Sequence, residues 1–161
     1  MDKKLFFVFV VGMILFSIFG VLAFDSPSDI NKAAQVTLDV ETVAKFYHDN
    51  FGTNYELARQ AMLELLKQET QVGTFNPYGN TANKDYGIAQ FHDAEGYPFY
   101  EIQNNFNKPE NSVLLAKVVS TFGFNPSNIY ISYLNEGNQR DIASLIFLME
   151  RFRLSLPHKG D

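Results

Sequence analysis

Three side chains between residues 69 and 90 are of types suited to acid–base chemistry and to the binding of a polar substrate. Glu69 and Asp85 are carboxylic acids, and Gln90 follows with an amide that can both donate and accept hydrogen bonds. Two carboxyl groups flanking a glycosidic bond can cleave it, with one of them protonating the leaving oxygen. The turn-rich residues between them allow the chain to fold back, so we expect all three side chains to converge on one cleft.

A helix over residues 54–70 should place Glu69 at its carboxyl end. Thr53 and Glu56 have the spacing of a capping box, and the segment contains neither Gly nor Pro. The periodicity puts Glu69 on the same apolar face as Met62, where desolvation and the helix dipole both disfavour the anion. A carboxyl group that keeps its proton can serve as an acid. The alternative is a solvated terminal residue.

Beyond this helix the chain turns and returns in extended form. Asn76, Pro77, Gly79 and Asn80 are turn formers, and we expect a short extended segment over residues 86–91. Two simpler interpretations stay open here. Asp85 could cap the turn through backbone N–H groups, and Gln90 could be an exposed polar residue of the strand.

These residues resemble the signature of the lysozyme-like superfamily. The resemblance rests on Glu69-Thr70, Phe75-Asn76-Pro77, Asn80 and Asp85-Tyr86-Gly87-Ile88-Ala89-Gln90-Phe91. Superfamily members carry Glu-Ser, Phe-Asn-Pro and Gly-Leu-Met-Gln-Ile in this order, and the loop looks like that of small lytic transglycosylases of conjugation and secretion machines. Thr70 and Phe91 depart from the usual Ser and Ile.

The downstream part of the resemblance has two alignments. Residues 132–137 echo an Ala-Tyr-Asn-Ala-Gly motif, whereas residues 128–134 are similar to Asn-Ile-x-x-Gly-x-x-Tyr-Leu. The resemblance implies an α+β, predominantly helical, lysozyme-like domain over residues 37–156, with a short extended hairpin beside the cleft. It implies catalytic roles for Glu69 and Asp85, and substrate-binding roles for four further residues: Tyr86, Gln90, Tyr133 and Asn135.

Three functions are compatible with this resemblance. The first is a lytic transglycosylase that cleaves the β-1,4 bond between N-acetylmuramic acid and N-acetylglucosamine, with Glu69 as acid and base. The second is a muramidase, a hydrolytic lysozyme that uses Glu69 and Asp85. The third is a non-catalytic wall-binding or assembly protein, suggested by Thr70 and the weak downstream motif.

The amino-terminal residues indicate export. Lys3 and Lys4 precede an uncharged apolar run over residues 5–24, which predicts a signal peptide or a membrane anchor. Residues 25–36 are predicted to be a linker, and the domain after them to be periplasmic or held at a cell-envelope or virion membrane. The expected partners are peptidoglycan glycan strands, with a trans-envelope secretion or conjugation machine or virion assembly as possible contexts.

Composition excludes several other classes of function. The chain has no cysteine, so disulfides and thiolate metal sites cannot form, and its three histidines lack ligand spacing. A net charge of −5 without basic clusters argues against nucleic acid as a partner. We expect neither a metal nor a cofactor, so glycan recognition would depend on aromatic rings and hydrogen bonds.

Further helices are predicted over residues 39–48, 107–123, 125–136 and 138–154, followed by a tail over residues 157–161. The apolar stripe of the last helix should form core.

Overall fold

The computed structural model describes residues 27–69 and 84–156. The predicted leader over residues 5–24, the turn motif at residues 75–80 and the tail lie outside these ranges. Among the described residues, no helix combines the length and the apolar character needed to cross a bilayer. The chain divides into a unit that ends at Lys32 and a larger one from Ala33 onward, and the contacts below all belong to the larger unit.

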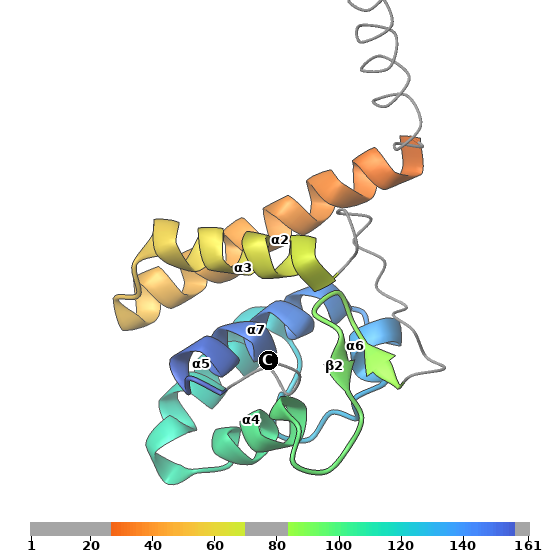
Figure 1. The fold of residues 1–161 in the computed structure, drawn as a ribbon. Helices are drawn as coiled ribbons and strands as arrows, with labels where there is room; N and C mark the ends of the chain where they lie inside the picture. The colour runs from red at the N-terminus through yellow and green to blue at the C-terminus, as the bar shows by residue number, and fades with distance from the viewer. Residues whose placement is uncertain (1–26, 70–83, 157–161) are drawn as a thin grey trace, which may run out of the picture. The chain divides into compact units, whose positions relative to one another are not determined.

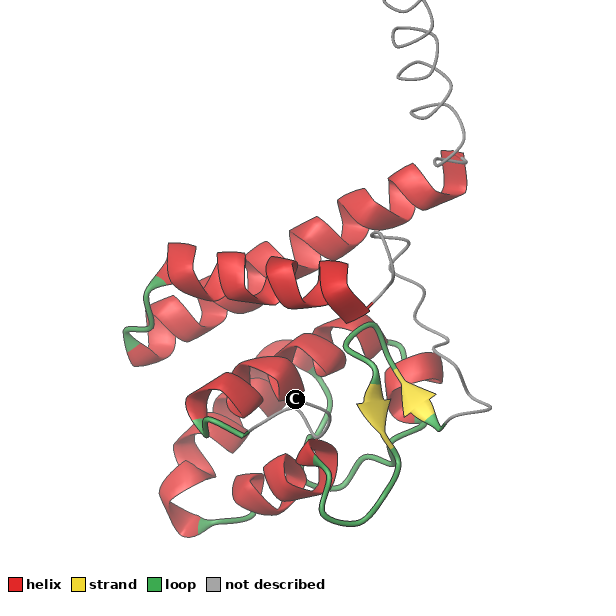
Figure 2. Ribbon diagram, viewed as in Figure 1, coloured by secondary structure: helices red, strands yellow, loops and turns green. Residues whose placement is uncertain are grey.

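The described chain is predominantly helical with one two-stranded antiparallel sheet, as the predicted α+β class requires (Figures 1 and 2). The elements in order are α2 (Pro27–Phe51), α3 (Tyr55–Glu69), β1 (Asp85–Tyr86), β2 (Phe91–His92), α4 (Pro98–Phe106), the 3₁₀ turn η2 (Pro109–Asn111), α5 (Ser112–Phe122), α6 (Tyr133–Glu136) and α7 (Arg140–Arg153).

Helix α7 is the centre of the core. Every residue from 142 to 151 is buried, including the polar side chains of Ser144, Glu150 and Arg151. The rings of Phe147 and Phe99 stack at 4.7 Å with an interplanar angle of 9°, and α3, α4 and α6 all pack on α7. The prediction that this helix belongs to the core is confirmed. The helix is buried on all sides, however, rather than along one apolar stripe.

Helix α2 begins at Pro27 rather than at Asp39, so most of the predicted linker belongs to a helix. It ends where Gly52 adopts a left-handed φ of 69°. The predicted capping box of α3 is wrong: the side-chain oxygen of Asn54 accepts the backbone N–H of Leu57 at 3.0 Å. Asn54 is therefore the N-cap, one residue later than Thr53.

The structure differs from the predicted helices in two places between residues 98 and 137. Helix α4 was not predicted, although Pro98 starts it and Phe99, Ile102 and Phe106 share its buried face. The predicted helix over residues 125–136 is reduced to α6. The Asn125 side chain accepts hydrogen bonds from Ser127 and forms a turn instead, which shows local side-chain bonding competing with a helix.

Candidate functional site

Glu69 is the last residue of α3 and is half-buried. Ala58, Met62 and Leu66 form the buried face of this helix, and Glu69 follows Met62 and Leu66 at seven- and three-residue spacing. The predicted helix and the position of Glu69 at the end of its apolar face are therefore confirmed. A carboxyl group at this position is partly shielded from water.

The direction of α3 relative to α7 brings Glu69 toward the hairpin. Thr53, just before α3, lines a cavity together with Glu150 and Arg153 near the carboxyl end of α7, and α3 packs along α7. Helices α3 and α7 therefore run antiparallel. The carboxyl end of α3 lies toward the amino-terminal half of α7, where the hairpin packs. Figure 1 shows the end of α3 at this side of α7.

The hairpin is built around a loop at residues 87–90. Strands β1 and β2 pair Asp85 with His92 and Tyr86 with Phe91. The carbonyl of Gly87 accepts the Gln90 backbone N–H at 3.1 Å and the Gln90 side-chain amide at 2.7 Å. Gln90 therefore closes its own loop, and one of its amide protons is used inside the protein.

Gly87 fixes the loop against two helices. Its φ of 72° lies in the left-handed region, and a Cβ at this position would stand 2.3 Å from Ser144 Oγ of α7 and 2.9 Å from Leu134 Cβ of α6. Its N–H donates to Asn135 Oδ1 at 2.7 Å in a buried hydrogen bond. Glycine is thus required both for its conformation and for the close packing.

Asp85 is held by a residue whose role the sequence did not reveal. Asp85 Oδ1 lies 2.8 Å from His92 Nδ1, and the two side chains are 25% and 34% exposed. The His92 ring also lies 4.6 Å from that of Tyr97, measured between centroids. The antiparallel register places Asp85 opposite His92, and this signal could have found the pair once the loop was located.

Helix α6 brings the downstream motif to the hairpin. Asn135 is buried, with 5% of its surface exposed, and its side-chain oxygen holds Gly87. The structure therefore gives Asn135 a positioning role in the loop. Tyr133 is half-buried beside Phe124 and Gly137, and Tyr86 is half-buried in β1. Ligand contact by Tyr133 or Tyr86 stays a prediction.

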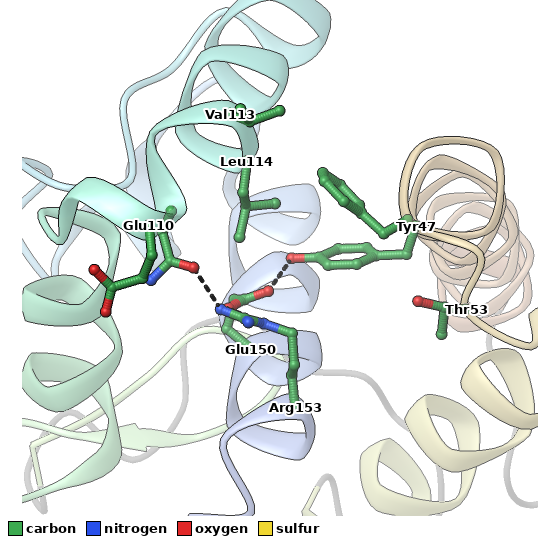
Figure 3. A pocket seen from close by; sticks show the side chains of 9 residues that line it. Tyr47, Thr53, Glu110, Val113, Leu114, Glu150 and Arg153 are labelled. Carbon is green, nitrogen blue, oxygen red and sulfur yellow. Dashed lines mark hydrogen bonds and ion pairs between the residues drawn. The ribbon is translucent and has the colours of Figure 1, made fainter.

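A cavity of about 410 Å³ lies elsewhere, between the end of α2, η2 and α7 (Figure 3). Its buried carboxylate, Glu150, accepts the Tyr47 hydroxyl at 2.9 Å on one oxygen and Arg153 at 2.7 Å on the other. Burial, reinforced by this carboxylate, raises the pKa of Tyr47 well above its usual value. Both oxygens of Glu150 are therefore bonded within the protein.

Among residues 27–69 and 84–156, no group of three or more His, Asp or Glu side chains is arranged to hold a metal ion. No protein-family model, curated protein or solved structure significantly matches this chain. The functional argument therefore depends on the site itself.

Proposed function

We propose that this chain is a peptidoglycan lytic transglycosylase with a lysozyme-like fold and with Glu69 as its acid and base. The observation that carries the proposal is the half-buried carboxyl group at the last residue of α3, a helix that packs on α7, against which Gly87 of the hairpin loop also lies. A single carboxyl group is sufficient for both halves of such a reaction.

Protonated Glu69 would donate its proton to the oxygen between N-acetylmuramic acid and N-acetylglucosamine, and the C1–O bond would break to leave a muramic cation. The Glu69 carboxylate would then take the proton from the C6 hydroxyl of the same sugar. The C6 oxygen would bond to C1 and close a 1,6-anhydro ring. No water is consumed, and Glu69 regains its proton.

A hydrolytic route is the second candidate, and the Asp85–His92 pair favours it. His92 fixes one oxygen of a carboxylate that is still partly exposed. A carboxylate held this way could stabilise or attack the sugar cation, as the second acid does in retaining glycosidases. The two routes differ in their products, because hydrolysis adds one water to the new muramic end and the anhydro route adds none.

The deciding experiment compares Glu69→Gln with the wild-type chain. The full chain is purified in mild detergent and incubated with peptidoglycan sacculi, and the released muropeptides are weighed by mass spectrometry. Loss of an acid–base group should lower the release rate about 100-fold or more. Glu64→Gln is the matched control, because Glu64 is exposed on the same helix and bonds only to Lys67 among the contacts resolved for it.

Circular dichroism should show that both variants melt as the wild type does, since Glu69 is only half-buried. Release of muropeptides by Glu69→Gln at the wild-type rate would refute the assignment. Binding of the wild-type chain to sacculi without any release would favour the non-catalytic wall-binding alternative.

A further inference from the structure

Tyr130 presents an unusually open aromatic surface next to α6. Its relative exposure is 84%, whereas aromatic side chains such as Phe91 and Phe99 are almost completely buried. Tyr130 lines a shallow depression of about 290 Å³ together with Ser132, Tyr133 and Glu136. We call this feature the Tyr130 depression.

Gly137 explains how the second ring of the depression is placed. Its φ of −67° and ψ of 153° are accessible to any residue, so the backbone does not require glycine. A Cβ at this position would stand 2.5 Å from the Tyr133 ring. Glycine is therefore needed for space, because it allows the Tyr133 ring to lie directly against the backbone at the wall of the depression.

The chemistry of the depression suits a sugar ring. The two tyrosines offer apolar faces on which the C–H groups of a pyranose can pack, and each has a hydroxyl at its edge. Ser132 and Glu136 are exposed at the rim, where a hydroxyl and a carboxylate can bond sugar hydroxyls and acetamido N–H groups. A volume of about 290 Å³ is at the low end for ligand sites, which favours one ring rather than a long chain.

The charge of the depression excludes other ligands. Glu136 is its charged lining residue, so a phosphate or a nucleic acid would meet repulsion there, and the chain as a whole carries −5. A single carboxylate is also too few ligands for a divalent cation.

We infer that the Tyr130 depression is a saccharide subsite that binds one pyranose ring of an N-acetylated glycan, with Tyr130 as its stacking surface. This inference rests on the proposed function for the identity of the glycan. The depression is joined to the hairpin through α6, since Tyr133 and Glu136 belong to the helix whose Asn135 holds Gly87.

The test measures binding of chitotetraose by isothermal titration calorimetry. The full chain in mild detergent carries Glu69→Gln in every sample, so that the probe is not cleaved. Adding Tyr130→Ala should weaken binding at least tenfold, because the stacking surface is removed, whereas Tyr130→Phe keeps the ring and should stay within twofold. Leu57→Ala is the matched control, since Leu57 is a 67%-exposed apolar residue of α3 outside the depression.

Gly137→Ala provides a second variant with an independent prediction. The added methyl group must displace the Tyr133 ring from the wall of the depression, so binding should weaken. The inference is overturned if the Glu69→Gln parent does not bind chitotetraose, or if Tyr130→Ala binds it within twofold of that parent.

Failure of the inference is distinguishable from failure of the proposed function. If the wild type releases no muropeptides but Tyr130→Ala still abolishes chitotetraose binding, the subsite stands and the catalytic assignment falls. If the wild type cleaves sacculi and Tyr130→Ala in the Glu69→Gln background binds chitotetraose within twofold of its parent, the catalytic assignment stands and the subsite falls.

Discussion

Replacing Gly87 with alanine should test how the hairpin is fixed. The substitution forces a side chain into a φ of 72° and places its Cβ 2.3 Å from Ser144 Oγ. A left-handed conformation costs an alanine about 1–2 kcal/mol. Overpacking of a dense core adds about 1–3 kcal/mol. The expected loss is therefore about 2–5 kcal/mol, a large part of the ~5–15 kcal/mol that stabilises a typical domain.

Gly123→Ala separates the two contributions. Gly123 ends α5 with a φ of 74°, which is nearly that of Gly87, but a Cβ there would meet nothing within 4 Å. This variant should lose only the conformational part, about 1–2 kcal/mol. The difference between the two variants therefore measures the packing of Gly87 against Ser144 and Leu134.

Urea denaturation followed by circular dichroism gives the free energy of unfolding of both variants. Ser144→Ala removes the nearest atom, so the double variant Gly87→Ala with Ser144→Ala should be more stable than the sum of the single effects implies, by about 1 kcal/mol. Equal losses for Gly87→Ala and Gly123→Ala, together with additive effects in the double variant, would refute the packing argument.

Two further predictions follow from the hydrogen bonds of the hairpin region. Asn135→Ala leaves the buried Gly87 N–H without its acceptor, so the free energy of unfolding should fall by about 1–3 kcal/mol, and faster exchange of the Gly87 amide proton in NMR should accompany it; unchanged exchange would contradict this role. The hydrogen bond from Tyr100 to Asp93, with a smaller effect of burial, raises the pKa of Tyr100 from 10.0 to about 12. The unfolded chain therefore releases this proton at lower pH than the folded chain, and stability that is fully present below pH 10.0 should be lost as pH rises toward about 12. Tyr100→Phe lacks this proton, so urea midpoints measured across that range should fall less steeply than those of the wild type; parallel curves would contradict the prediction.

The helices with strong local signals could be predicted from the sequence. Helix α3 has an uninterrupted apolar periodicity and ends at Glu69 as expected, and the left-handed Gly123 ends α5 as its position suggested. Helix α4 was not predicted, because its buried face is formed mainly by aromatic residues and becomes evident only from its tertiary contacts. Its Phe99 instead stacks on Phe147, a contact between distant segments that local patterns do not contain.

The site was only partly predictable for the same reason. Its carboxyl groups and the hairpin loop follow from local residue types. The bond from Gly87 to Asn135 joins residues 48 positions apart, and the Asp85–His92 pair depends on strand register. Tyr130 was not singled out, because a tyrosine in a sequence gives no indication of whether its ring is buried or, as here, open to solvent.

The late position of α7 in the chain has a consequence for biosynthesis. Helix α3 and the hairpin leave the ribosome well before α7, the helix on which they pack. Gly87 cannot pack against Ser144 or Leu134 until those residues have been synthesised. A nascent chain that stops short of α7 exposes the apolar partners of that helix and lacks the surface against which the hairpin loop packs. Partial translation products should therefore be quickly degraded.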